Sequence, residues 1–429
     1  MAMAQALPDD GIMRAADGTP LKVALARAQR REKLRAMGLI LPLFLFIVLS
    51  FVTPILVMLY NAVYDPDVAD NLPQTISALK AWDGTDLPPE EVFAAFVVDM
   101  KAAQQNRQVA LVGKRLNYEI SGIRSKVIAT GRKVGAIEAP PYKDAVIAID
   151  KVWGENETWA TIKRSSSEYT PFYLLAMLDM RQSVDGAVER QPAERRIYWD
   201  VLKRTLGISF LVTAMTLIFG YPVAYLLATS PQKTASILMI FVLLPFWTSL
   251  LVRTTAWMIL MQDNGVFSQF LSITGITWLL NLFGYIDGTP RLFHTRFATV
   301  VAMMHIQLPF TLLPIYSVIK TISPNYMRAA KSLGGTPFYS FVRVYMPQTL
   351  PGVAAGCLLT FIISLGYYIT PALVGGPTDQ MISGFIFSAI NNENNWGKAS
   401  ALGVILLVAT IILYYAYNKL VGIDRMKLG

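Results

Sequence analysis

The sequence predicts an all-α, polytopic integral membrane protein with six transmembrane helices and a largely helical extracytoplasmic insert between the first and second. Of the 429 residues, 54% are hydrophobic and mean hydropathy is +0.42. Only 16% are charged, whereas soluble proteins carry about a quarter. Long uncharged runs, each sufficient to cross a bilayer, recur along the chain. Between the first two runs lies a polar stretch long enough to fold as a small domain.

Composition also narrows the class of protein. The chain has one cysteine, Cys357, and two histidines, so an internal disulfide is impossible and a zinc site is disfavoured. We therefore predict that this chain binds no metal and no cofactor. The formal charge of +9 could suggest nucleic acid, but the basic excess lies beside the apolar runs, as in a protein embedded in a lipid bilayer. No nucleic-acid partner is predicted.

Residues 1–36 are polar and basic and are predicted to form a cytoplasmic segment. Basic side chains gather just before the first apolar run: Arg27, Arg30, Arg31, Lys33 and Arg35. Residues 37–61 follow as an apolar run long enough for the first transmembrane helix. Because lysine and arginine favour the cytoplasmic side, we expect this helix to start in the cytoplasm.

Residues 62–200 are predicted to form an extracytoplasmic insert domain. Apolar spacing predicts helices at Pro89–Gln105 and Glu168–Met180. Acidic and basic residues are nearly balanced in this stretch, which suits a long translocated loop that is exempt from the positive-inside rule. A loosely ordered loop is the alternative. A packed domain is favoured by the aromatic residues Phe93, Phe96, Trp153, Trp159, Phe172 and Tyr173.

The remaining core, residues 201–421, is predicted to contain five more spans. They are Leu206–Thr229, Ala235–Met261, Ala298–Lys320, Gly352–Val374 and Ser400–Val421. Six spans that start inside also end inside, so residues 422–429 are expected to form a cytoplasmic tail. The basic residues at this end agree with that side of the membrane: Lys419, Arg425 and Lys427. The predicted location is the cell inner membrane.

A polar, basic island at residues 323–353 lies between two of these spans. A serine–proline pair opens a helix there, and the pair Gly334-Gly335 stops it. A threonine–proline pair at 336–337 repeats the start signal. The second segment is expected to end by Pro347, because the residue before a proline disfavours helical geometry. The sequence therefore predicts two short helices with a corner between them, on the cytoplasmic side.

Motifs for catalysis are absent from the sequence. There is no Gly-x-x-x-x-Gly-Lys-[Ser/Thr] phosphate loop, no His-Glu-x-x-His and no Gly-x-Ser-x-Gly. We predict that the chain is not an enzyme and has no catalytic residues. The predicted spans also lack Asp and Glu. Proton- and sodium-coupled transporters commonly place carboxylates at membrane depth, so that class is disfavoured.

Six residues in the spans are candidates to line a translocation pathway: Arg253, Trp257, His305, Tyr367, Tyr368 and Thr370. Aromatic faces attract cationic ligands by roughly 0.5–2 kcal/mol each. For each aromatic residue the alternative is simple packing or a place at the membrane interface. Arg253 could instead extend toward the outer headgroups.

Residues of the island fall at fixed offsets: Ala329, Ala330, Gly334, Phe341, Pro347 and Pro351. This spacing resembles the EAA loop of the membrane subunits of ABC importers. Arg328 stands where that family has Glu, and Met346 stands where it has Leu. The resemblance implies that the loop docks on a separate ATPase. The implied docking residues are Arg328, Ala329, Ala330, Ser332, Gly334, Gly335, Pro337, Phe341 and Pro347.

Further stretches are similar to spermidine/putrescine-type permeases, namely 251–271, 308–334, 364–383 and 395–407. The resemblance implies a type I importer with two permease chains, two ATPase subunits that carry ATP and Mg²⁺, and an extracytoplasmic binding protein. The second permease is expected to be a different chain.

The implied substrate is a polyamine or a related cationic or amino compound. Polyamine permeases often carry an acid where Tyr367 stands, so solutes of related permeases stay open: opines, phosphonates, amino-acid-like compounds and ferric ion. A membrane-anchored sensor with the insert as its ligand domain is the alternative from another class. It predicts a cytoplasmic signalling domain, whereas the longest predicted cytoplasmic pieces are 1–36 and the island.

Overall fold

A computed structural model describes residues 20–183, 186–263, 265–282 and 291–421. The predicted tail, 422–429, and the first nineteen residues of the predicted N-terminal segment lie outside the described residues. The chain divides into two compact units, residues 1–60 and 61–429.

The first unit is a long helix in three parts. They are α1 (Leu21–Ile47), a π-helical turn (Val48–Val52) and α2 (Thr53–Asn61). The stretch Glu32–Asn61 is long and apolar enough to cross a membrane. The predicted first span is therefore confirmed as a helix.

The insert is largely helical, as predicted. Its helices are α3 (Pro73–Leu79), α4 (Glu90–Gln105), α5 (Val109–Asn117), α6 (Ile123–Lys133), α7 (Tyr142–Ile149), α8 (Asn156–Arg164) and α9 (Phe172–Met177). Helix α4 confirms the first predicted helix. The second, predicted over Glu168–Met180, is shorter. The chain leaves the helix there because β1 (Met180–Gln182) pairs antiparallel with β2 (Val188–Arg190).

Aromatic side chains fill the core of the insert. Phe93, Phe96, Trp153 and Trp159 are fully buried, and their rings lie 4.5–5.8 Å apart between centroids. Both indole N–H groups have acceptors, namely the Thr130 hydroxyl at 2.8 Å and the backbone carbonyl of Trp153 at 2.9 Å. Such satisfied aromatic packing is the signature of an ordered domain, so the loosely ordered alternative is wrong.

The two ends of the helical part of the insert are far apart in the sequence but lie side by side in the structure. Tyr64 pairs antiparallel with Tyr169. Thr170 donates its N–H to the carbonyl of Val63 at 2.7 Å, and Asp65 donates to the carbonyl of Glu168 at 2.8 Å. We call residues 63–65 and 168–170 the clasp. Helices α3 to α8 lie, in the sequence, between the two segments of the clasp.

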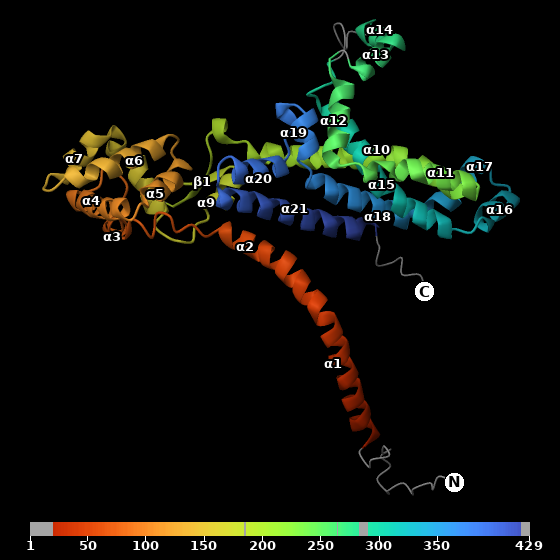
Figure 1. Ribbon diagram of the computed structural model, residues 1–429, viewed down its shortest axis with the longest axis horizontal. Coiled ribbons are helices and arrows are strands. Elements are labelled where there is room, and N and C mark those ends of the chain that lie inside the picture. The colour runs from red at the N-terminus through yellow and green to blue at the C-terminus, as the bar shows by residue number, and fades with distance from the viewer. Residues whose placement is uncertain (1–19, 184–185, 264, 283–290, 422–429) are drawn as a thin grey trace. The chain divides into compact units, whose positions relative to one another are not determined.

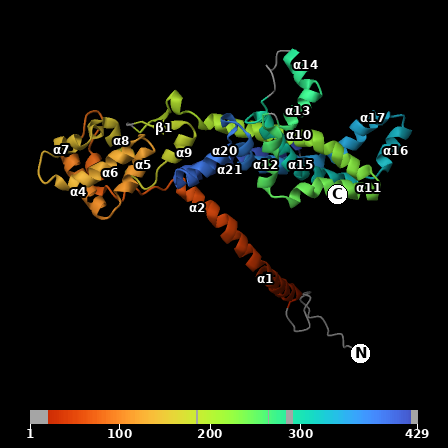
Figure 2. The same cartoon turned by 45° about the horizontal axis from the view of Figure 1, so that its top comes forward.

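The membrane core is built on four long helices, α10 (Tyr198–Thr229), α15 (Arg296–Thr321), α18 (Met346–Leu365) and α21 (Trp396–Val421). Helices α10, α15 and α18 pack against one another, and α21 packs against α18 and α20 (Ile382–Asn391) (Figures 1 and 2). Within the described residues, five helical stretches can cross a membrane, or six if a bent pair is one span. The predicted polytopic all-α fold is confirmed.

The bent pair corresponds to the third predicted span. Helix α11 (Gln232–Leu243) is followed by a 3₁₀ turn and then by α12 (Leu250–Met261), at 99° to it. Pro245 lacks an N–H and disfavours helix before it. The Ser249 hydroxyl then accepts the N–H of Val252 at 3.2 Å and starts α12. The predicted span is thus two helices. Two further helices follow, α13 (Val266–Ile273) and α14 (Ile276–Leu282).

The fifth predicted span, Gly352–Val374, also needs correction. Helix α18 ends at Leu365, and a separate short helix, α19 (Ile369–Val374), follows. At the other end, the prediction that the island's second segment ends by Pro347 is wrong. Helix α17 (Pro337–Ser340) continues through a π-helical turn, Phe341–Tyr345, directly into α18.

The two π-helical turns explain why prolines interrupt neither helix. Val48–Val52 lies just before Pro54, and Phe341–Tyr345 lies just before Pro347. A proline removes one helical N–H and clashes with the carbonyl four residues earlier. That carbonyl lies inside the wider π turn in both cases, where hydrogen bonds run to the fifth residue back. The wider turn therefore lets the chain continue as a helix.

Candidate functional site

The predicted corner, which we call the coupling corner (residues 323–345), begins as its sequence signals indicate. Helix α16 covers Asn325–Ser332. Gly334 then adopts φ +89°, a conformation that glycine reaches without steric cost. The Thr336 hydroxyl accepts the N–H of Tyr339 at 3.3 Å and caps α17. Two short helices meet at the glycine pair, as the sequence predicts.

Large apolar side chains project from the coupling corner. Leu333 is 89% exposed and Phe338 is 78% exposed. Tyr326 and Tyr339 are exposed as well. Of the nine predicted docking residues, six are exposed (Arg328, Ala329, Ser332, Gly334, Pro337 and Pro347) and three are half-buried (Ala330, Gly335 and Phe341).

Phe341 anchors the corner to the membrane core instead of facing outward. Its ring lies 5.3 Å from that of Tyr225 on α10 and 5.7 Å from that of Tyr345. The side-chain amide of Gln348 donates to the carbonyl of Val344 at 2.8 Å, which supplies a donor beside Pro347. The corner is therefore tied to α10 by aromatic packing and to α18 by continuous helix.

The predicted pathway residues fall into two groups. Trp257 on α12 donates its indole N–H to Nδ1 of His305 on α15 at 3.1 Å. Thr370 on α19 shares a hydrogen bond of 3.2 Å with Thr254 on α12. These contacts place three of the six candidates where α12, the second helix of the bent pair, meets α15 and α19.

The other three candidates make different contacts, although Arg253 lies on α12 as well. Tyr368 stacks on Phe387 of α20 with centroids 4.8 Å apart, and Tyr367 packs beside a buried cluster that includes Met303. Nε of Arg253 is buried and has no hydrogen-bond partner within the described ranges. An arginine without a buried acid at membrane depth is costly, which singles out this side chain.

A line of buried hydroxyl groups was missed by sequence reasoning. Thr311 on α15 bonds Thr216 on α10 at 2.9 Å and Thr360 on α18 at 2.6 Å. Gly356 lies against the same threonine, since a Cβ there would come 2.5 Å from the Thr311 carbonyl oxygen. Gly352-x-x-x-Gly356 was the available signal, because such small-residue spacing marks close helix contacts.

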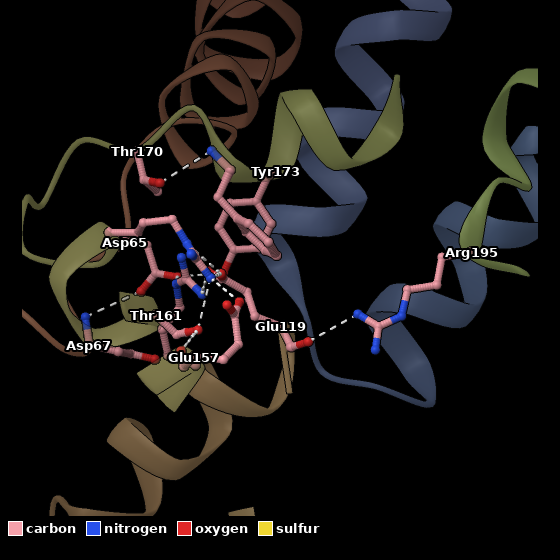
Figure 3. A network of polar contacts seen from close by, with 11 residues as sticks. Asp65, Asp67, Glu119, Glu157, Thr161, Thr170, Tyr173 and Arg195 are labelled. Carbon is pink, nitrogen blue, oxygen red and sulfur yellow. Dashed lines mark hydrogen bonds and ion pairs between the residues drawn. The ribbon is translucent and has the colours of Figure 1, made fainter. Parts of the chain in front are cut away.

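Within the insert, a buried charge network ties α5 and the clasp to α9 (Figure 3). Arg115 on α5 is 1% exposed, and its guanidinium pairs with Asp65 at 3.0 Å and Glu119 at 2.9 Å. The Tyr173 hydroxyl donates to Asp65, and the Arg115 guanidinium lies 4.4 Å from the centre of the Phe172 ring. Burial and the negative charge of Asp65 raise the pKa of Tyr173 well above its ordinary value, so it stays a neutral donor.

The insert also holds the starts of two membrane helices. The buried carboxylate of Asp179 accepts the N–H groups of Ile197, Tyr198 and Trp199 at 2.8–3.1 Å and caps α10. Gly397, in the first turn of α21, lies so close to the Tyr173 ring that a Cβ would overlap it. A cavity of about 680 Å³ opens beside these contacts, with lining residues from α5, α9 and α21.

The comparisons with known proteins concern the membrane core. Residues 217–421 match a family described as "Binding-protein-dependent transport system inner membrane component". The spermidine/putrescine transport system permease protein PotB of Salmonella typhimurium (strain SL1344) is 31% identical over 51% of this chain and 74% of its own length. PotB of Escherichia coli (strain K12) is also 31% identical, over 51% of this chain and 77% of its own length.

Two further proteins are similar. The inner membrane ABC transporter permease protein YdcU of Escherichia coli (strain K12) is 31% identical over 52% of this chain and 72% of its own length. A bacterial ABC transporter involved in the import of the acidic polysaccharide alginate has a solved chain that is 18% identical. It aligns over 54% of this chain and 80% of that chain, with a TM-score of 0.39.

Proposed function

Because the chain is a multi-pass inner-membrane protein of the family of type I, binding-protein-dependent ABC importer permeases, we propose that it forms half of a solute pathway driven by a separate ATPase. The observation that carries the proposal is the coupling corner, which exposes Leu333 and Phe338. Its continuous helical connection to α18 offers a rigid lever, so that movement of the docked ATPase would reorient the span.

The proposed assembly contains two ATPase subunits, a second and different permease chain, and an extracytoplasmic binding protein. ATP and Mg²⁺ bind the ATPase subunits, and both ends of this chain lie in the cytoplasm. The family description supports the binding protein, and the basic residues before the first span support the orientation.

Co-purification tests the docking role of the corner. Gly334→Val places a β-branched residue at φ +89°, which such residues avoid, and so distorts the corner. Gly135→Val is the matched control, because that glycine has open surroundings and no positive φ. We expect the ATPase encoded beside this chain to co-purify with wild type and with the control, and not with Gly334→Val. Equal recovery with all three would overturn the docking role.

For the substrate we propose a polyamine or related cationic compound. Relatives 31% identical carry the name of spermidine and putrescine permeases. Three aromatic candidates, Trp257, Tyr367 and Tyr368, offer faces that attract cations.

One observation favours a second candidate, a solute with an acidic group such as an amino-acid-like compound or a phosphonate. The buried Arg253 Nε has no partner among the described residues, and the predicted spans carry no acid. Uptake into vesicles that contain the whole transporter distinguishes the two. Arg253→Gln leaves polyamine uptake intact or raises it, whereas it abolishes uptake of an acidic solute that uses the guanidinium.

We propose that the insert lies on the outer face and either docks the binding protein or covers the entrance. Its attachment to the starts of α10 and α21 supports this role. The clasp allows a clean test, in which a short Gly-Ser linker replaces residues 67–166 and Asp179 is retained. We expect normal assembly with loss of uptake. Normal uptake by the assembled variant would refute the role.

A further inference from the structure

The coupling corner carries charge of one sign only. The sequence has no Asp or Glu between Asp287 and Asp379. Arg328, Lys331 and Arg343 are exposed, and none of them forms an ion pair within the described part of the chain. Among the residues that the structure describes, these three cations therefore have no counter-charge.

The cations surround an apolar centre. Leu333 and Phe338 are the two most exposed large apolar residues of the corner. Arg328 and Lys331 lie three residues apart on α16, so they share a face of that helix. Arg343 borders a shallow hollow that Phe338 also lines. An apolar centre with a charged margin is the usual anatomy of a protein interface.

We infer that the ATPase surface that receives the corner has an apolar centre rimmed by aspartate and glutamate side chains that face Arg328, Lys331 and Arg343. This inference rests on the proposed function. Bringing three cations against a neutral or basic surface would remove water from them without compensation. A complementary acidic rim removes that penalty and also selects this ATPase over others with basic grooves.

The test uses the full chain with its partner permease in nanodiscs of neutral lipid, and measures the Kd for the purified ATPase at low and high salt. The test variant is Arg328→Glu/Lys331→Glu. The matched control is Arg132→Glu/Lys133→Glu, a pair of exposed basic residues on α6 of the insert. We expect the test variant to bind at least about tenfold more weakly at low salt and to lose the salt dependence of wild type. The control binds as wild type does.

Each other outcome has a distinct meaning. If wild type itself does not bind, the proposed function fails. If wild type binds and the test variant binds equally well or more tightly, the acidic rim is wrong and docking is apolar. Repeating the measurement in nanodiscs with anionic lipid covers the remaining source of negative charge, because a weakening seen only there would assign the cations to lipid headgroups. Gel filtration and melting temperature of each variant show that the corner's change has not unfolded the chain.

Discussion

The insert and the membrane bundle are both helical, yet their cores are built from different residues. Fully buried aromatic rings form the centre of the insert core, whereas the contact of α10, α15 and α18 combines aliphatic residues such as Leu227, Leu312 and Ile315 with buried hydroxyl groups and glycines. In water, burying an aromatic side chain is favourable by about 25 cal/mol per Å² of apolar surface. Lipid tails are as apolar as leucine, so helices in a membrane gain instead from close packing and hydrogen bonds. The surrounding solvent thus decides what a good core residue is.

The largest effect is expected from emptying the insert core. Trp159→Ala removes a fully buried side chain and should cost about 3–5 kcal/mol, a large share of the stability of a small domain. Denaturant unfolding of the full chain, followed by the remaining tryptophan fluorescence, measures the loss. Val98→Ala on the exposed face of α4 is the control. Equal losses in the two variants would contradict the aromatic core.

A smaller loss of stability is expected when one carbon is added at a close contact between the membrane helices. Gly356→Ala places a Cβ 2.5 Å from the Thr311 carbonyl oxygen and should cost about 1–3 kcal/mol through overpacking. Reversible unfolding in bicelles measures it. The control is Gly207→Ala on α10, where no atom lies within 4 Å of the added carbon. A harmless Gly356→Ala would show that the helices can separate freely at this point.

Removing the shared hydroxyl sharpens the comparison further. Thr311→Val keeps the shape and deletes two hydrogen bonds, and we expect a cost of about 0.6 kcal/mol for each of them, about 1.2 kcal/mol together. Thr410→Val, which removes a bond only to its own helix, serves as the control in the same bicelles. A loss as large as that of Trp159→Ala would mean that polar contacts, and not packing, dominate the bundle.

The smallest effect depends on pH. Asp99 is buried in the insert and accepts the N–H and hydroxyl of Thr75 at 2.7 Å each. Burial raises its pKa above the ordinary value. Its protonated form therefore stabilises the insert at pH below about 4, the unfolded pKa, and that contribution is lost as pH rises through the raised native pKa.

Asp99→Asn keeps an acceptor for Thr75 and removes the titration. We expect wild type to lose insert stability relative to this variant as pH rises from about 4 to 7, measured by thermal melts of the full chain. Parallel curves for the two proteins would show that the carboxyl does not titrate differently on folding.

Start and stop signals in the sequence predicted the ends of short helices well. The prolines in the predicted spans did not show where a membrane helix would break. The start and stop signals around Gly334 and the helix Glu90–Gln105 both follow the sequence. Pro245 breaks its span, yet Pro222 and Pro309 lie inside continuous helices. In a membrane bundle, neighbouring groups decide whether a proline is accommodated, and one sequence does not reveal them.

The candidate sites also differ in how far the sequence predicted them. The corner depends on residues close in sequence, so its shape was predictable. The hydrogen bond between Trp257 and His305 joins two residues that are 48 positions apart in the sequence and lie on different helices, and the residue types gave no indication of that pairing. The Thr216–Thr311–Thr360 line likewise depends on how three helices pack.

The clasp has a consequence for how such a protein can change over generations. A segment whose two ends lie side by side can be inserted where a short turn would otherwise connect the chain. A gene can therefore gain, lose or exchange it as one piece without changing the path of the membrane helices. The hydrogen bonds that join residues 63–65 to 168–170 mark where that exchange would be made. The transport core and the outer domain are then free to diverge at different rates.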